Sequence, residues 1–171
     1  MVLLMIVCNT ERLIIRHFKE SDSKFVLKLL NDESFIKNIG DKKVRNNDDA
    51  IQYLNNGPIA SYQQYGFGLN IVLLKDTSEP IGMCGLLKRE QLDFPDLGYA
   101  LLPEYCSKGY AKEASLAVME NGHEKHKLTN ILAFTSQQNE SSNGLLKRLG
   151  FVFKGIVNMN GVDDNLYEYK F

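Results

Sequence analysis

The sequence predicts an α+β fold, a single domain over residues 1–171 with a mixed central sheet of about seven strands and helices on both faces. Two observations favour this fold. The β-rich runs at 67–75 and 81–88 are joined by turn residues and predict an antiparallel hairpin. A strand, helix, strand, helix series follows from residue 96, and a crossover helix lets its two strands pair in parallel.

The N-terminal part begins with two short strands, one from Ile6 onward and one over 13–16. A helix is predicted from about Asp22, because the apolar residues after it recur at helical spacing. These residues are Phe25, Val26, Leu29 and Leu30. Asp48 or Asp49 is expected to cap a second helix.

Asn56-Gly-Pro58 is predicted to interrupt that second helix, because proline lacks the backbone donor that a helix interior needs. Pro58 would then begin a further short helix that runs through Tyr65. Gly66-Phe-Gly68 lacks the helix and Lys-Ser/Thr pair that follow a phosphate loop, so we interpret it as the entry to the next strand. Residues 76–80 then join the two strands of the hairpin.

In the C-terminal half, residues 96–102 add a third antiparallel strand, and a helix follows over about 109–125. The strand at Asn130 is expected to pair with the strand over 96–102 in parallel. Asn160-Gly161 predicts a tight turn before a last strand over 166–169. We find no internal repeat, linker or low-complexity tract.

Net charge and cysteine spacing limit the partners and the cellular compartment that we expect for the protein. The formal net charge is −1 and the pI is near 6.3, so no general basic field is available to attract nucleic acid or anionic lipid. The three cysteines, Cys8, Cys84 and Cys106, have no metal-clip or disulfide spacing, which fits a reducing cytosol. We therefore expect a cytoplasmic protein with no nucleic-acid partner and no membrane partner.

The apolar N-terminus, residues 1–8, ends in a cysteine as a lipoprotein signal does. It lacks the positively charged region and the small residue that such a signal has before its cleavage site. Met5 is an alternative start, so residues 1–5 are expected to be a disordered or alternative-start segment.

The stretch from Asp96 to Ala114 predicts an anion site. An apolar strand breaks at Pro103 and re-enters as a helix through a glycine-containing loop. The first turn of a helix has backbone N–H groups without partners and carries partial positive charge, so it can hold a phosphate. The candidate ligands are Ser107, Lys108, Gly109, Tyr110 and Ala111. The same layout is common in structural loops, and the Lys108 side chain is either a phosphate ligand or a solvated helix-end lysine.

Short segments over nearly the whole chain carry a family resemblance. They are Thr10-Glu-Arg-Leu-Ile-Ile-Arg16, Gly66-Phe-Gly68, Ile81-Gly-Met-Cys-Gly-Leu86, Pro103-Glu-Tyr105, Lys108-Gly-Tyr-Ala111, Leu149-Gly-Phe151 and Leu166-Tyr-Glu168. In this order they resemble the GNAT superfamily of acyl-CoA-dependent N-acyltransferases, and within it the Rim-type ribosomal-protein N-terminal acetyltransferase branch.

The resemblance implies acetyl-CoA as cosubstrate and no metal. In the family, the strand that matches residues 96–102 and its parallel partner splay apart, and the pantetheine arm of CoA lies in the gap. The arm would pair like a strand with Ala100, Leu101 and Leu102, with the pyrophosphate on the amides of residues 107–111. Asn139 would bind the other end of the pantetheine.

The resemblance also implies catalytic roles at the last helix. Asn139 and Ser142 would lie beside the thioester sulfur, and a backbone N–H near Ala100 or Leu101 would stabilise the oxyanion. An ordinary helix N-cap also explains Ser142. Many family members carry a tyrosine as general acid where this chain has Leu146, which shifts protonation of the departing thiolate to Ser142 or water.

The acceptor amine must lose a proton before it attacks, and the nearest acids are Asp96 and Glu90. Asp96 stands at the start of the central strand, where related proteins often place an acid. The competing interpretation is a solvated turn aspartate.

Several other residues have side chains that occur in catalytic or metal sites, but the sequence around them lacks the pattern of such a site. A helix N-terminus would lower the pKa of Cys106, yet no histidine is near it in sequence, so a spectator thiol is favoured over a nucleophile. His123 and His126 lie three apart without a third metal ligand. Tyr99 and Tyr105 are core aromatics or groove walls.

These observations predict an N-acetyltransferase that works by direct transfer in a ternary complex, with a protein N-terminal α-amine as the first acceptor. The alternatives are a small-molecule amine, such as an aminoglycoside or polyamine, and a CoA-sensing module without turnover. An acid-lined acceptor pocket would favour the cationic small molecules. The aromatic strand over 166–171 would pair with a second copy if it were a sheet edge, which makes a homodimer a further expectation.

Overall fold

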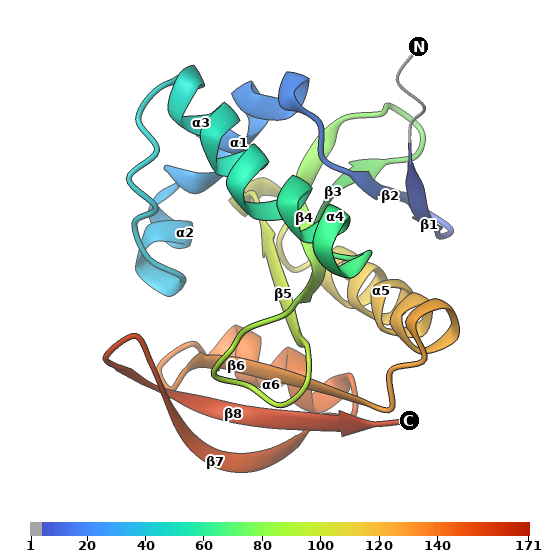
Figure 1. Ribbon diagram of the computed structural model, residues 1–171, viewed down its shortest axis with the longest axis vertical. Coiled ribbons are helices and arrows are strands. Elements are labelled where there is room, and N and C mark those ends of the chain that lie inside the picture. Colours follow the sequence, from blue (N-terminus) through green and yellow to red (C-terminus); the bar gives the residue numbers. More distant parts are fainter. Residues whose placement is uncertain (1–4) are drawn as a thin grey trace.

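The computed structural model describes residues 5–171, so the predicted alternative-start segment lies outside the described residues apart from Met5. A single sheet of eight strands forms the centre, in the order β1-β2-β3-β4-β5-β6-β8-β7 (Figure 1). The strands are β1 (Ile6–Asn9), β2 (Leu13–His17), β3 (Leu69–Leu74), β4 (Pro80–Leu87), β5 (Asp96–Leu101), β6 (Asn130–Ser136), β7 (Val152–Met159) and β8 (Val162–Lys170). Every neighbouring pair is antiparallel except β5 and β6, which confirms the mixed α+β fold.

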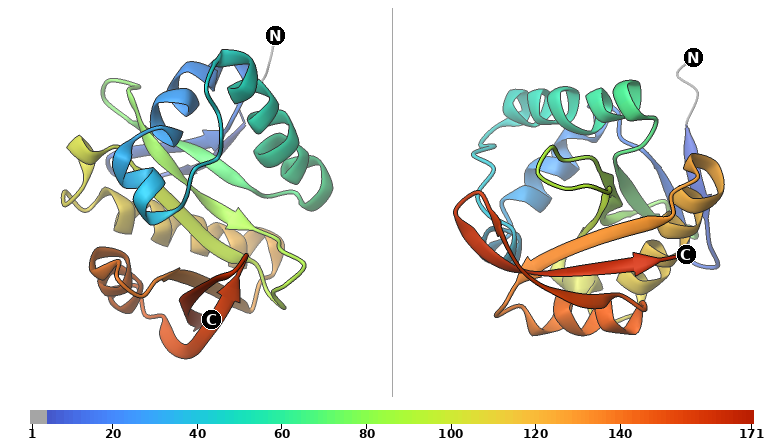
Figure 2. Two further views of the ribbon diagram at one scale, coloured as in Figure 1. Left: turned by 90° about the vertical axis from the view of Figure 1, so that its left-hand side faces the viewer. Right: turned by 60° about the horizontal axis from the view of Figure 1, so that its bottom comes forward.

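Helices cover both faces of the sheet. They are η1 (Glu20–Asp22), α1 (Ser23–Leu30), α2 (Glu33–Asn38), α3 (Asn47–Leu54), η2 (Asn55–Ile59), α4 (Ala60–Tyr65), η3 (Pro103–Tyr105), α5 (Tyr110–His126) and α6 (Glu140–Arg148). One buried cluster, which includes Val26 and Leu54, packs α1 and α3 on one face. Another, which includes Val118 and Leu146, packs α5 and α6 on the opposite face. In the right-hand view of Figure 2, α3 and α4 run along the top of the sheet and α6 along the bottom.

Three details differ from the expected elements. The sheet has one strand more than predicted, because β7 carries Lys154, Gly155 and Asn158 and shows no clear apolar alternation. The cap of α3 is Asn46, whose side chain accepts from the Asp49 backbone N–H, so the prediction of Asp48 or Asp49 was wrong. Pro58 does not break the helix, because a π-helical turn, η2, carries the chain from α3 into α4.

The central parallel pair separates almost as soon as it forms. Asp96 of β5 pairs with Leu132 of β6, and the Leu132 N–H donates to the Pro95 carbonyl at 2.9 Å. No further register is present between these strands in the described chain, and Figure 1 shows β5 and β6 diverging. This confirms the predicted splay and leaves one edge of β5 without a neighbouring strand.

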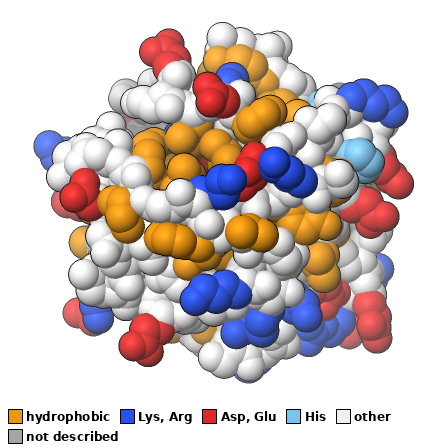
Figure 3. All heavy atoms as spheres, turned by 90° about the horizontal axis from the view of Figure 1, so that it is seen from below, with side chains coloured by type: hydrophobic (Ala, Val, Ile, Leu, Met, Phe, Trp, Pro, Cys, Tyr) orange, Lys and Arg blue, Asp and Glu red, His pale blue; other side chains and the backbone are white. Residues whose placement is uncertain are grey.

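The C-terminal strand is not a sheet edge. β8 lies between β6 and β7, with its backbone paired on both sides, so the prediction of an exposed edge at residues 166–171 was wrong. The edge strand at this end of the sheet is β7, on which Val152, Phe153 and Ile156 are exposed. Figure 3 views this end of the molecule and shows apolar side chains interspersed with charged ones. A homodimer that forms by strand pairing at this end of the sheet would use β7 rather than β8, and the homodimer stays a prediction.

Within residues 5–171, no helix combines the length and apolar character that a membrane crossing requires.

Candidate active site

The register of β4 and β5 determines which backbone groups of β5 face the gap. The Leu102 N–H donates to the Ile81 carbonyl of β4 at 2.9 Å. Because backbone direction alternates along a strand, Gly98 and Ala100 also bond to β4, whereas the N–H groups of Tyr99 and Leu101 point away from it. Between the two residues expected to meet the oxyanion, this alternation favours Leu101 over Ala100.

The loop between η3 and α5 has the backbone shape of an anion site. Ser107 and Gly109 adopt left-handed conformations, with φ of 61° and 85°. Gly109 is the N-cap of α5 and provides no side-chain cap, so the first N–H groups of the helix, from Tyr110 and Ala111 onward, have no cap acceptor. A CoA site needs free backbone donors for the pyrophosphate, and these unpartnered N–H groups meet that requirement.

Arg12, the residue before β2, contacts this loop and helps to hold its conformation. Its Nη1 donates to the Lys108 carbonyl at 3.0 Å, and its Nε donates to Glu113 Oε2 at 2.7 Å. The guanidinium carbon also lies 4.3 Å from the centre of the Tyr110 ring. The Lys108 side chain is exposed and extends over the Tyr105 ring, where its ammonium remains available to a phosphate. Sequence reasoning missed Arg12, since its partners lie about a hundred positions away.

The start of α6 places Ser142 beside β5. Asn139 is the N-cap, and its Oδ1 accepts from the Ser142 backbone N–H at 3.1 Å. The Ser142 hydroxyl lies 2.8 Å from the Tyr99 hydroxyl, so this hydrogen bond spans from α6 to β5. Burial, opposed by the hydrogen bond to Ser142, raises the pKa of Tyr99 to about 12, and the phenol keeps its proton.

Asn143, which sequence reasoning also missed, anchors the same helix. Its Nδ2 donates to the Ser136 and Asn139 carbonyls, and its Oδ1 accepts from Asn165 Nδ2 and the Tyr167 hydroxyl. The side chain at the family's tyrosine position, Leu146, is fully buried in the core. The leucine at this position therefore offers no proton donor to the gap.

Asp96 is buried at the closed end of the gap, and the solvated-turn interpretation was wrong. Its carboxylate accepts from Arg89 Nε at 2.9 Å, and the residue is 2% exposed. Burial outweighs the charge of Arg89 and raises the pKa of Asp96 to about 6. Because side chains alternate along a strand, Asp96 and Tyr99 lie on opposite faces of β5. Glu90, the other candidate base, is exposed in the β4–β5 connection.

A groove of about 340 Å³ opens on the face of the sheet that α3 and α4 cover. Its lining residues are Tyr53, Asn56, Gly57, Pro58, Ala60, Ser61, Gln64, Tyr65, Leu69, Leu87 and Lys88. A methyl group placed on Gly98 of β5 would lie 2.9 Å from Leu87 Cδ1 and 3.4 Å from Leu69 Cδ2. Leu69 and Leu87 therefore separate the groove from Gly98 of β5, on the same face of the sheet as Asp96.

The remaining candidates have structural surroundings. Burial, together with Asp32 and Glu104, raises the pKa of the Cys106 thiol, so the predicted lowering was wrong. His123 stacks on Phe171 with ring centres 4.3 Å apart, and His126 meets the Phe67 ring edge-on at 5.2 Å. Over residues 5–171, no group of three or more His, Cys, Asp or Glu side chains is arranged to hold a metal ion.

Three features together indicate an acyl-CoA-dependent transferase. The parallel strands β5 and β6 splay apart, α5 after β5 has an uncapped N-terminus, and α6 after β6 has a serine in its first turn. The family model of the acetyltransferase (GNAT) domain matches residues 12–152, and the chain belongs to this family.

Named relatives agree with this assignment. YoaA, an uncharacterized N-acetyltransferase of Bacillus subtilis (strain 168), is 26% identical over 168 residues, which cover 94% of each chain. YnaD, an uncharacterized N-acetyltransferase of the same organism, is 28% identical over 147 residues, covering 86% of this chain and 83% of the relative. The solved structure of RimL, a ribosomal L7/L12 alpha-N-protein acetyltransferase in complex with coenzyme A, superposes with a TM-score of 0.82 at 18% identity, covering 96% of this chain and 97% of that chain. At this identity the superposition shows the shared fold.

Proposed function

We propose that this N-acetyltransferase moves an acetyl group from acetyl-CoA to the α-amine of a protein or peptide N-terminus. The observation that carries the proposal is the free edge of β5, which lies between the uncapped loop at Ser107 and Gly109 on one side and the Tyr99–Ser142 pair on the other. Each task of a direct transfer then has a candidate group on β5 or beside it.

Acetyl-CoA supplies an activated thioester carbonyl, so the protein has to align the amine, stabilise negative charge on the carbonyl oxygen and return a proton to the thiolate. The Leu101 N–H points into the gap and is the proposed donor to the carbonyl oxygen. Ser142, held by Tyr99 and by the Asn139 cap, is the proposed proton donor to the sulfur.

Asp96 is the proposed base. A carboxyl with a pKa of about 6 is largely ionised at neutral pH and is more basic than an ordinary aspartate. It lies on the face of β5 opposite Tyr99, which suits an amine and a thioester sulfur that approach from opposite faces of the sheet. Glu90 is the alternative base, acting through water.

The groove at α3 and α4 is the proposed acceptor site. Its volume of about 340 Å³ suits a few residues of an extended chain. Among the described residues that line it, none is a carboxylate, so it lacks the acid lining that would favour an aminoglycoside or a polyamine.

Acetyl-CoA binding measured by calorimetry tests the cofactor assignment, with Gly109→Trp as the matched variant. Wild type should bind at micromolar concentration, and the variant should lose binding, because its side chain fills the space over the loop amides. Free-thiol release with N-terminal peptides, aminoglycosides and polyamines then identifies the acceptor. Release driven by peptides supports the proposal, and release driven by a polyamine or an aminoglycoside contradicts it. Binding without release from any amine would instead favour a CoA sensor.

A further inference from the structure

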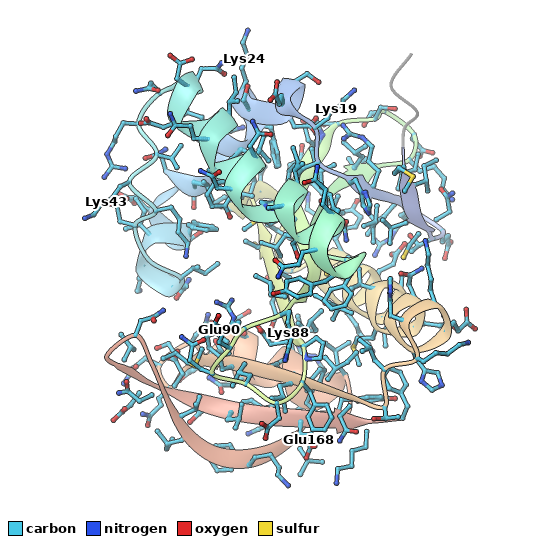
Figure 4. All side chains as sticks on the ribbon, in the orientation of Figure 1. Lys19, Lys24, Lys43, Lys88, Glu90 and Glu168 are labelled. Carbon is cyan, nitrogen blue, oxygen red and sulfur yellow. The ribbon has the colours of Figure 1, made fainter. Side chains whose placement is uncertain are left out.

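Among the described residues that line the proposed acceptor groove, one side chain is charged, and it is a cation. Lys88 follows directly after β4 at the mouth of the groove. Its Nζ donates one hydrogen bond to the Leu92 carbonyl at 3.2 Å, which positions the ammonium and leaves its other protons available. In Figure 4, Lys88 lies between the α3–α4 layer and the C-terminal strands, whereas Lys24 lies at the far end of the molecule.

Further positive charge lies behind Lys88. Arg89 is bound to Asp96 through Nε alone, and its Nη atoms make no other hydrogen bond to described residues. The charge of Arg89 reaches Tyr53 in the groove wall, where burial raises the pKa of the phenol and Arg89 opposes the rise. Burial and the charge of Arg89 also lower the pKa of Lys42, in the loop before α3. Arg89 and Lys42 lie outside the groove lining, so among the described residues Lys88 is the cation that a bound acceptor would contact.

The acids nearby do not cancel this charge within the groove. Asp96 is committed to Arg89. Glu90 and Asp93 belong to the same connection as Lys88, but both are exposed and neither lines the groove. An acceptor lying in the groove would therefore meet hydroxyl and amide groups along its length and an ammonium at the β4 end.

We infer that the acceptor is an amine whose carrier bears a negatively charged group, a carboxylate or a phosphate, and that Lys88 selects it. This inference rests on the proposed acetyl transfer and names the class of its acceptor. The amine is directed towards Asp96, and the anionic group towards the ammonium of Lys88. The charge of Lys88 disfavours cationic acceptors.

The test uses two matched sets of acceptors. One set consists of amidated hexapeptides that share an N-terminal serine and differ only at the second residue, which is Asp, Asn or Lys. The other set compares phosphoethanolamine with ethanolamine, so that a small phosphorylated amine is distinguished from an acidic peptide. Free-thiol release gives kcat/KM for each, and calorimetry on the CoA-loaded protein gives binding.

For the wild type, we expect the anionic member of at least one set to exceed its neutral partner by about 5- to 10-fold in kcat/KM, since a partly exposed charge pair contributes modestly. In Lys88→Met, which keeps most of the aliphatic stem, the ratio should fall to near one. Lys88→Arg keeps the positive charge and should retain the preference. That result would show that a substitution at position 88 does not by itself disrupt the groove. Lys24→Met, an exposed lysine on α1, is the matched control and should leave the ratio unchanged.

An equal or better rate with the lysine peptide, together with no preference for phosphoethanolamine over ethanolamine, overturns the inference. A preference that persists in Lys88→Met also overturns it. If no amine releases thiol but the anionic member still binds more tightly through Lys88, acetyl transfer fails and the charge selection stands. If the anionic members show neither turnover nor tighter binding, the inference is wrong.

Discussion

At the residue scale, Tyr99 of β5 is the phenol that contacts the first turn of α6. The buried Leu146 side chain leaves the sulfur end of the gap without a phenol from α6, and β5 places one there from the other side. The Tyr99 hydroxyl is held at Ser142 rather than free, so we assign it a positioning role. Its pKa of about 12 keeps it a neutral partner of the serine throughout the working pH range.

Removing either hydroxyl should therefore lower turnover more than CoA binding. Ser142→Ala is expected to reduce kcat by at least about 100-fold if it supplies the proton. Tyr99→Phe removes one hydrogen bond and should reduce kcat by about 3- to 10-fold. In the double variant the two effects should not multiply, because Tyr99 acts through Ser142. Steady-state kinetics measure this, and fully multiplicative losses would show that Tyr99 acts elsewhere.

Asp96 gives the protein a specific pH dependence. The unfolded carboxyl ionises near pH 4, whereas the folded one keeps its proton up to about pH 6 because burial disfavours the charge. Between these values the native state binds more protons, so the free energy of unfolding should fall as pH rises from about 4 to about 6, by about 1 to 3 kcal/mol. Asp96→Asn should lack this fall.

Urea unfolding at several pH values, compared between wild type and variant, measures the effect. Asp93→Asn is a suitable control, because Asp93 is exposed in the same connection. A wild-type stability that rises over this interval relative to Asp96→Asn would mean that the ion pair with Arg89 outweighs burial.

At the scale of elements, the first turn of α6 links stability to chemistry. Asn139 caps the helix through the Ser142 N–H, so the cap and the proposed proton donor share one turn. Asn139→Ala should destabilise the protein by about 1 kcal/mol and also reduce kcat. Asn139→Asp keeps an oxygen acceptor and should retain the stability. Thermal unfolding and turnover measured on both variants check this, and an alanine variant with normal stability would exclude the cap.

The elements predicted from sequence were those with a local signal. The apolar runs at Leu69–Leu74 and Pro80–Leu87, and the Asn160-Gly161 turn, specify their conformations over a few residues. β7 lacked such a signal because an edge strand is solvated and needs no alternating pattern. The six-residue α2 was not predicted either.

The candidate site also contains features with a local sequence signal and features that depend on contacts between distant residues. The helix N-terminus at Gly109 was predictable because it follows from a strand, a glycine and a helical pattern, and its role in anion binding stays a prediction. The burial of Asp96 and the direction of the Leu101 N–H were not, because both depend on which strands pair and in what register. The Tyr99–Ser142 contact joins residues 43 positions apart and depends on the packing of α6 against β5.

At the scale of the whole molecule, the sheet consists of two parts that share one backbone pair. A pantetheine arm in the gap would supply the missing neighbour of β5. At a concentration of 100 times its Kd, acetyl-CoA should stabilise the fold by about 2.7 kcal/mol, which thermal unfolding measures.

Hydrogen exchange gives a sharper form of this prediction. The amides of Tyr99 and Leu101 face the gap and should exchange more slowly when CoA is bound. The amides of Gly98 and Ala100 already bond to β4 and serve as internal controls that change less. Equal protection of all four amides would place the pantetheine outside the gap.

The contacts of Arg12 determine when the CoA loop can be completed during protein synthesis. It contacts Lys108 and Glu113, which lie 96 and 101 positions later in the chain. A ribosome adds roughly 5 to 20 residues per second, so Arg12 emerges several seconds before the residues it braces. Acetyl-CoA therefore has no finished site on the nascent chain until most of the protein has been translated.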